Sequence, residues 1–161
     1  MTPCRSCELT ADPGKSPGGS ILDTGLWSLT HAIEPIPMVG WLILQPRRHV
    51  EHFADLTADE ALQYGPLVQH ICQTLSTELA PAKIYLAMFA EARGFAHLHT
   101  HLIPRSADMP EERRGPRVFE YLRQAGTENQ NLGDVRAAIR LAESLRVRLS
   151  TRQQSRGSSS A

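Results

Sequence analysis

The feature of the sequence that most constrains the fold is the segment AHLHTHLIPR at residues 96–105, where histidines alternate with other residues. Successive side chains of a β-strand point to opposite faces, so a strand would place His97, His99 and His101 on one face. The opposite face would carry Ala96, Leu98, Thr100 and Leu102, which are mostly apolar. A helix would scatter the three rings around its axis. We therefore predict a strand with its back in the core and its front lining a site.

The shared histidine face is open to three interpretations. It is a solvated surface rich in histidine, a three-histidine metal site, or a site that divides the work. In the third case one imidazole binds metal, one attacks a substrate and one stabilises charge. Same-face neighbours on a strand lie about 6.5–7 Å apart, so three rings converge with difficulty on one ion whose bonds measure about 2.0–2.1 Å. We therefore favour the third interpretation, in which the three histidines have different roles.

A pair of cysteines near the N-terminus supports this division. Cys4 and Cys7 form a C-x2-C pair, the usual two-thiolate half of a tetrahedral zinc site. A redox interpretation would need a preceding strand and a following helix, and a pair so close to the start of the chain lacks that context. Zinc needs two more ligands, for which His49 and His97 are the candidates. The other histidines, at 31, 52 and 70, are simply interpreted as surface or loop residues.

Composition limits the classes of partner. The chain has 161 residues, enough for one domain, and its 17 basic residues balance 17 acidic ones. Neutral charge gives no electrostatic reason to expect a nucleic-acid or membrane partner. No apolar run approaches the roughly 20 residues that span a bilayer, and no secretion signal is recognisable at the start. Three cysteines fit a reducing compartment, so we expect a cytoplasmic protein.

The remaining elements follow from local patterns. Thr57 and Glu60 form a capping box that starts a helix over residues 57–79, with a kink or delayed start expected at Gly65-Pro66. Residues 21–46 predict two or three short strands, and residues 82–90 predict a buried strand. Shorter patterns predict helices over 117–125 and 135–149, the latter capped by Asp134. Residues 150–161 are expected to be a disordered tail.

The histidine segment resembles the signature of the histidine-triad (HIT) superfamily, including the Pro-Arg that follows it. CRSC at residues 4–7 is similar to the opening of the zinc-containing bacterial branch, and GWLILQPRRHVEHFADLTADE is similar to the family's strand, P-x-R/K-H and capped helix. The resemblance covers about residues 4–105. It implies an α+β fold with an antiparallel sheet of about five strands, a long capped helix and a C-terminal helix. One domain over 1–149, with a helical extension from 106, and a homodimer are expected.

The resemblance also implies a chemistry. The substrate would be a nucleoside phosphate or a dinucleoside polyphosphate, and His99 would attack the α-phosphorus to form a nucleotidyl-histidine intermediate. His101 would contact a phosphate oxygen. Structural zinc would be held by Cys4, Cys7, His49 and His97. Water as acceptor would make the protein a hydrolase and a phosphate acceptor would make it a nucleotidyltransferase. The alternatives are a nucleotide-binding regulatory module with negligible turnover and a zinc-stabilised interaction domain.

Four positions depart from the family pattern. Arg93 and Gly94 stand where the family has Gln and Ser/Thr, whose side chains contact the leaving group and α-phosphate. Arg93 is interpreted equally well as a replacement phosphate contact or as a surface turn residue, and Gly94 still offers a backbone N–H. On the ribose side, His31 stands in place of an Asn or Asp, with Glu34 nearby. Trp41 stands where many members have a histidine, and it is predicted to lie in the core.

Overall fold

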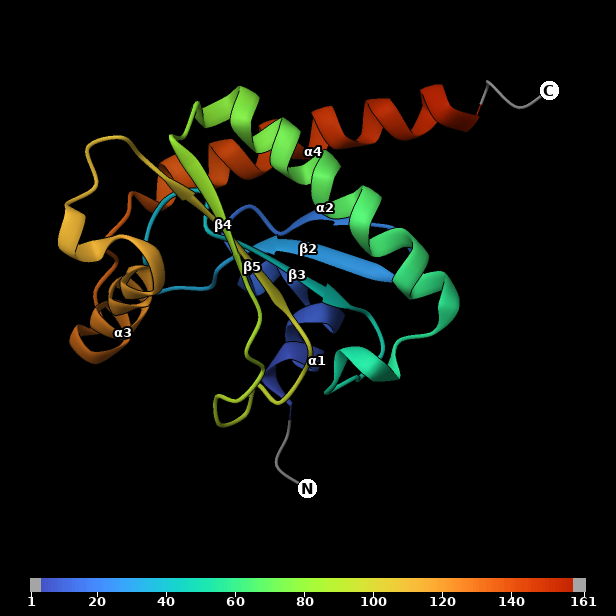
Figure 1. Cartoon of the computed structure of the whole chain (residues 1–161), viewed down its shortest axis with the longest axis horizontal. Coiled ribbons are helices and arrows are strands. Elements are labelled where there is room, and N and C mark those ends of the chain that lie inside the picture. The colour runs from blue at the N-terminus through green and yellow to red at the C-terminus, as the bar shows by residue number, and fades with distance from the viewer. Residues whose placement is uncertain (1–3, 158–161) are drawn as a thin grey trace.

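The computed structural model of the chain describes residues 4–157, and for residues 151–157 it describes only the course of the helix (Figure 1). Its centre is a five-stranded antiparallel sheet with strand order β1-β2-β3-β5-β4. The strands are β1 (Ser20–Asp23), β2 (Trp27–His31), β3 (Leu42–Pro46), β4 (Lys83–Ala87) and β5 (Thr100–Arg105). The predicted α+β class with a sheet of about five strands is confirmed.

Four α-helices are described around the sheet. They are α1 (Arg5–Ala11), α2 (Ala58–Leu79), α3 (Phe119–Glu128) and α4 (Val135–Gly157). The helices predicted over 57–79 and 117–125 correspond to α2 and α3, and α2 runs through Pro66 without ending. The predicted cap of the last helix is present, because Asp134 Oδ1 accepts hydrogen bonds from the backbone N–H groups of Arg136 and Ala137.

The last helix is longer than predicted. α4 continues to Gly157, so residues 150–157 of the expected disordered tail are helical. Between Leu149 and Gly157 the sequence has neither proline nor glycine, the two residues that most disfavour a helix interior. Residues 158–161, the rest of that tail, lie outside the described residues.

One face of the sheet is covered by α2 and α4, which run across it beside one another (Figure 1). Paired residues on neighbouring strands share a face, and Leu29 pairs with Leu44 while Leu42 pairs with Leu102. These four leucines are fully buried against side chains of both helices. The helices therefore enclose the main core on this face.

The opposite face carries the candidate site residue His101. Ile43 pairs with His101 there, beside a second buried cluster that includes Trp41 and Ile103. The α1 helix is fastened on the same side of β3, because the Gln45 amide donates hydrogen bonds to the Ser6 carbonyl (3.1 Å) and the Thr10 hydroxyl (2.6 Å). This arrangement brings the N-terminal cysteines up to the sheet.

Two strand predictions need correction. The strand predicted over residues 96–105 begins only at Thr100, because the His97 N–H bonds back to the Phe95 carbonyl (2.7 Å) and turns the chain out of the ladder. The strand predicted as buried over residues 82–90 is the edge strand β4. Leu86, in its middle, is 52% exposed, since an edge strand has a neighbour on one side only.

Glu60 joins the start of α2 to the chain after β3. It is 2% exposed, and its carboxylate oxygens accept hydrogen bonds from Arg48 (2.8 and 2.7 Å) and from the Thr57 N–H (2.7 Å). The Glu60 carbonyl accepts a hydrogen bond from the Trp27 indole at 3.1 Å. The Arg48 guanidinium lowers the pKa of Glu60 to about 2, with a smaller effect from Thr57.

We expect Glu60→Gln to destabilise the fold by about 1–3 kcal/mol at pH 7, because it removes the charge that Arg48 requires. The pKa of Glu60 is lowered from 4.5, so its stabilising effect is complete above pH 4.5 and is lost as the pH falls toward 2. Urea unfolding at pH 7 and pH 3 measures the difference. The matched control is Asp59→Asn, an exposed carboxylate in the same helical turn. Equal losses in the two variants would contradict the role of Glu60.

Candidate active site and metal centre

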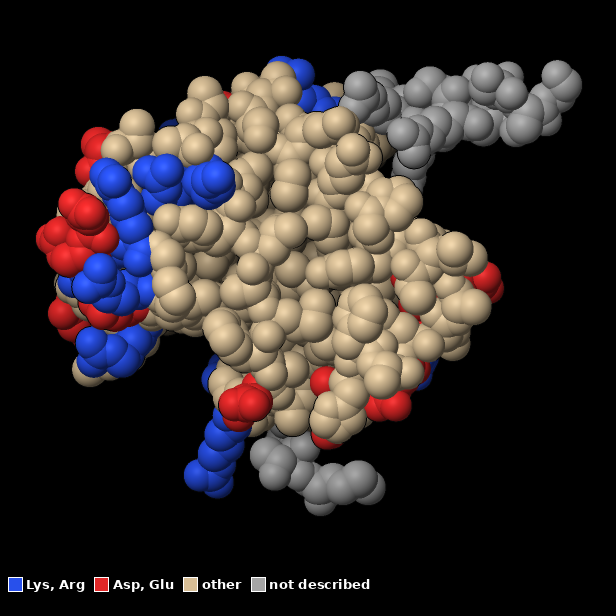
Figure 2. Space-filling model, viewed as in Figure 1, with Lys and Arg blue, Asp and Glu red and all other residues tan. Residues whose placement is uncertain are grey.

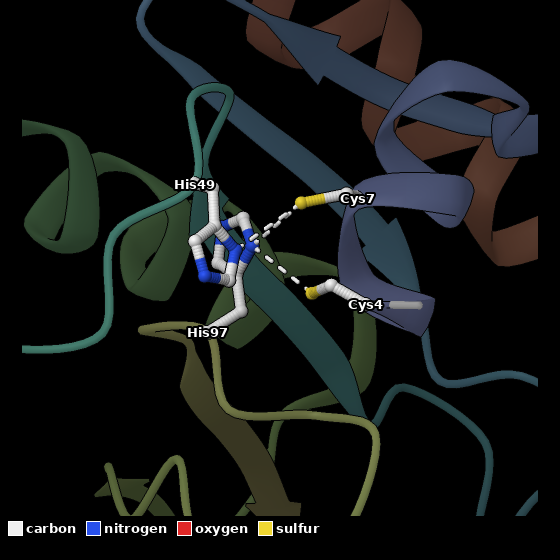
Figure 3. Close-up of side chains that lie close together, drawn as sticks. All are labelled: Cys4, Cys7, His49 and His97. Atoms are coloured by element: carbon white, nitrogen blue, oxygen red, sulfur yellow. Dashed lines mark hydrogen bonds between the residues drawn. The ribbon is translucent and has the colours of Figure 1, made fainter. Parts of the chain in front are cut away.

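Four side chains from three parts of the chain form a candidate metal centre (Figure 3). Cys4 and Cys7 come from the start of α1, His49 from the segment after β3, and His97 from the segment before β5. Their ligand atoms all lie within 4.8 Å of one another. The structure thus brings together the four residues that the sequence predicts as metal ligands.

The distances suit tetrahedral coordination. The Cys7 Sγ lies 3.4 Å from Nδ1 of both His49 and His97, and the Cys4 Sγ lies 3.7 Å from Nδ1 of His97. A tetrahedral zinc ion with sulfur and nitrogen ligands has sulfur–nitrogen separations of about 3.5 Å. Two thiolates and two imidazoles form a common structural zinc set. The residue types and these three separations therefore fit a tetrahedral zinc site.

The outer nitrogens of both histidines have oxygen partners. His97 Nε2 lies 2.9 Å from the Pro46 carbonyl, to which it donates, and His49 Nε2 lies 3.3 Å from a carboxylate oxygen of Glu51. With the proton on Nε2, the lone pair is on Nδ1, which faces the sulfur atoms in both rings. Partners of this kind orient metal-binding histidines.

Burial favours the neutral forms of the side chains in this centre. Burial raises the pKa of the Cys7 thiol to about 11, and the neighbouring Cys4 thiol adds to this effect. Burial also lowers the pKa of His97, which favours its neutral ring. A neutral imidazole is ready to bind metal, and a bound divalent cation would stabilise both thiolates.

His99 lies directly beside this centre. Its Nδ1 is 2.6 Å from the backbone carbonyl of His97, so this nitrogen donates its hydrogen and Nε2 keeps the lone pair. Burial lowers the pKa of His99, which keeps the ring neutral near pH 7. A neutral imidazole with an unprotonated Nε2 is a competent nucleophile.

His101 packs against His99, with 4.8 Å between the ring centroids. Its Nδ1 lies 2.9 Å from the indole Nε1 of Trp41, and Phe119 from α3 packs edge-on against the His101 ring at 5.1 Å. Burial, and to a lesser extent the neighbouring imidazole of His99, lowers the pKa of His101 to about 3. His101 is therefore a neutral ring held among aromatic side chains.

His31, predicted on the ribose side, does not join this group. It pairs with Leu42, whose partner on β5 is Leu102, so its side chain lies on the helix-covered face and not on the face of His101. The ring is fully buried, and its two nitrogens bond the Ala32 carbonyl and the Gly40 N–H, each at 2.9 Å. His31 is a structural residue, and we remove it from the candidate substrate contacts.

Arg93 and Gly94 form the corner of a tight turn. The Phe95 N–H bonds the Ala92 carbonyl at 2.8 Å, and Gly94 has φ +82°, as the third residue of a type II turn requires. The Gly94 carbonyl also accepts the Arg5 N–H at 2.8 Å, which ties the turn to α1. The Arg93 side chain is exposed. The backbone explains Gly94, and the Arg93 guanidinium is accessible to a ligand.

The sequence interpretation missed two contacts of His101. It correctly placed Trp41 in the core, where it is fully buried, but not its hydrogen bond to the histidine. A buried indole N–H needs an acceptor, and this requirement was the available signal. Phe119 lies 18 residues beyond His101, and no local pattern indicates that α3 returns to the site.

Comparison with known protein families identifies the family to which the chain belongs. The sequence profile described as "HIT domain" matches residues 14–108, more than half of the chain. The protein therefore belongs to the HIT domain family, as the histidine segment predicts. The match starts after the Cys4–Cys7 pair, so it does not bear on these two cysteines. The evidence for the candidate metal centre is the geometry of its four side chains. The sequence matches no curated protein.

Solved structures of distant relatives share the fold. A zinc-bound histidine triad family protein from Mycobacterium smegmatis aligns with TM-score 0.62 and 18% identity, covering 94% of this chain and 96% of that one. A hypothetical histidine triad nucleotide-binding protein from Sulfolobus tokodaii aligns with TM-score 0.64 and 14% identity, covering 92% and 93%. Plasmodium falciparum diadenosine triphosphate hydrolase, in complex with cyclomarin A, aligns with TM-score 0.57 and 13% identity, covering 82% and 76%.

A membrane-spanning helix is not found in the part of the chain that the structure describes.

We expect the purified protein to bind about one equivalent of zinc and Cys7→Ser to bind almost none, because a tetrahedral site that loses a thiolate holds zinc far less tightly. Elemental analysis after dialysis measures the zinc content. A chelator should lower the melting temperature of the wild-type protein, since zinc binds the folded state preferentially. Cys72→Ser is the control, because Cys72 lies on α2 outside the cluster. Equal zinc contents in the two variants would exclude the proposed ligand set.

Proposed function

We propose that the protein is a HIT-type enzyme that attacks the α-phosphate of a nucleoside phosphate or dinucleoside polyphosphate through His99. The observation that carries the proposal is the 2.6 Å contact between His99 Nδ1 and the His97 carbonyl. It places the ring's one proton on Nδ1 and directs reactivity to Nε2. With water as acceptor the protein is a hydrolase, and with a phosphate acceptor it is a nucleotidyltransferase.

In the first step His99 Nε2 attacks the α-phosphorus, an Nε2–P bond forms and the bond to the leaving group breaks. The positive charge that develops on the imidazole is stabilised by the Nδ1–H bond to the His97 carbonyl. In the second step the acceptor oxygen attacks phosphorus, the Nε2–P bond breaks and the neutral ring returns. The leaving group of the first step takes the bonding electron pair with it, and any proton of the acceptor passes to solvent in the second step.

His101 supplies a hydrogen-bond donor for this chemistry. Its ring is neutral and lies beside His99, so one N–H is available for a phosphoryl oxygen on which negative charge increases. Zinc, when bound by Cys4, Cys7, His49 and His97, supplies structural support. The side chain of His97 would then be held by the ion while its carbonyl holds His99.

Similar proteins support this class of substrate. The structural relatives include a protein described as nucleotide-binding and a diadenosine triphosphate hydrolase. Nucleic acid fits less well, because the 17 basic residues of the chain are balanced by 17 acidic ones and the basic side chains near α3 lie beside acidic ones on the visible face (Figure 2). A nucleic-acid groove would need a continuous basic surface.

We also propose a cytoplasmic homodimer, as the family resemblance implies. The free thiols of Cys4, Cys7 and Cys72 suit a reducing compartment. Leu86 and Phe89 are 52% and 60% exposed at and just beyond edge strand β4, where a second copy could cover them. The mass in solution tests the oligomeric state.

A second candidate is a nucleotide-binding regulatory module with negligible turnover. The observation that favours it is the exposed Arg93 and the Gly94 corner in place of the amide and hydroxyl that the family uses near the leaving group. The module would bind nucleotide at His99 and His101 and form no covalent intermediate.

We expect His99→Ala to lower kcat by roughly a thousandfold or more, because the step through Nε2 is lost. Mixing the wild-type protein with adenosine 5′-phosphoramidate or a diadenosine polyphosphate and quenching in base should give a mass increase of one nucleotidyl group, absent from His99→Ala. The control is His52→Ala, an exposed histidine outside the site. Nucleotide binding without adduct or product would instead support the regulatory module.

Arg93→Ala should lower kcat/KM about tenfold for a diadenosine polyphosphate, because the guanidinium forms charge-assisted bonds to a phosphate leaving group. The same variant should leave hydrolysis of the phosphoramidate within about twofold, since that leaving group has no phosphate for Arg93 to bind. Steady-state kinetics on both substrates measure the ratio. Equal losses on both substrates, or none, would contradict a leaving-group contact by Arg93.

A further inference from the structure

We propose that Trp41 is a positioning residue that fixes the tautomer of His101, so that Nε2 carries the proton that His101 donates. This inference rests on the proposed function for its catalytic consequence. Its structural part stands independently, because the position of a proton on an imidazole can be measured without turnover.

The hydrogen-bonding capacity of the Trp41 indole decides which nitrogen of His101 carries the proton. Trp41 Nε1 lies 2.9 Å from His101 Nδ1, and an indole N–H donates but cannot accept. His101 Nδ1 must therefore be the acceptor and carry no hydrogen. A proton on Nδ1 would set two N–H groups against each other in a buried place. Both the opposite tautomer and the doubly protonated ring are disfavoured, and the proton of the neutral ring lies on Nε2.

Because Trp41 can only donate a hydrogen bond, it permits only one of the two tautomers of His101. A histidine at this position, as in many family members, could donate or accept and would leave both tautomers of its partner accessible. Trp41 is fully buried immediately before β3, on the sheet face that carries His101. Solvent therefore cannot replace the indole as partner of Nδ1.

Phe119 holds the two rings in place. It packs edge-on against His101 at 5.1 Å and 90° and against Trp41 at 5.3 Å and 86°, while Trp41 and His101 meet at 5.7 Å and 87°. The three rings form a closed aromatic cluster at the site. A half-turn of the imidazole about its Cβ–Cγ bond, which would put Cδ2 in place of Nδ1 beside the indole, is opposed by the packing of the other two rings.

The restraint matters for the reaction because the two tautomers interact oppositely with phosphate. With the proton on Nε2, His101 donates to a phosphoryl oxygen and stabilises its increasing charge. With the proton on Nδ1, Nε2 would present a lone pair to that oxygen and repel it. Trp41 therefore acts on the substrate through His101 and does not need to touch it.

The test measures the tautomer of His101 by nitrogen-15 NMR of the full-length, zinc-loaded protein, with His101→Gln used to assign the signals. In the wild-type protein we expect a protonated Nε2 and an unprotonated Nδ1. In Trp41→Phe, which keeps an aromatic ring but no donor, both His101 signals should move toward averaged values. The kcat should fall about tenfold with a smaller change in KM, since a transition-state contact is weakened.

The matched control is Trp27→Phe. Trp27 is also buried, and its indole also donates one hydrogen bond, to the Glu60 carbonyl at 3.1 Å, but it lies in the core beneath α2. The Trp27→Phe variant should lose about as much stability as Trp41→Phe, but its His101 signals and its kcat should be unchanged. This comparison separates positioning from a general loss of stability.

Each outcome decides the proposal. A wild-type His101 with its proton on Nδ1 would overturn it, even if Trp41→Phe does not fold. Unchanged signals and kcat in folded Trp41→Phe would overturn it as well. If the signals move in Trp41→Phe and none of the proteins turns over any substrate, the role of Trp41 in fixing the tautomer is supported and the proposed enzymatic function fails.

Discussion

The contact on which the site depends is the hydrogen bond from His99 Nδ1 to the carbonyl of His97. His97 contributes to the site through both its side chain and its backbone. Its ring lies among the candidate metal ligands and bonds the Pro46 carbonyl, while its backbone orients the ring of His99. This is possible because the chain leaves the sheet ladder before Thr100, so that His97 turns toward α1.

The two faces of the sheet carry different groups of residues. Cross-strand pairing places the leucines of β2, β3 and β5 under α2 and α4, and it places His101 on the side of Trp41 and α3. Because neighbouring residues of a strand point to opposite faces, a shift of one residue along β2 would move a histidine from one face of the sheet to the other. His31 lies on the face covered by the helices for this reason. The candidate metal centre, the proposed nucleophile His99 and the aromatic cluster of Trp41, His101 and Phe119 then share the face that the two long helices do not cover.

Patterns that are local in the sequence were predictable. The capping box of Thr57 and Glu60, the Asp134 cap and the C-x2-C pair all depend on residues within one or two helical turns, and the structure contains each of them. What failed depends on pairing between distant segments. The face of His31 and the edge position of β4 follow from strand register and order, which a single sequence does not specify. The Trp41–His101 bond joins residues 60 positions apart.

The position of α4 bears on how the protein is made. Leu141, Ala142, Leu145 and Leu149 belong to the same buried cluster as the first three strands, and Arg146 bonds the Ser20 carbonyl at 2.7 Å. A nascent chain that has emerged only as far as the histidine segment already contains every strand and every candidate metal ligand. Its sheet still lacks the cover that α4 provides over its apolar face. Synthesis must therefore proceed through the last helix before this face is enclosed.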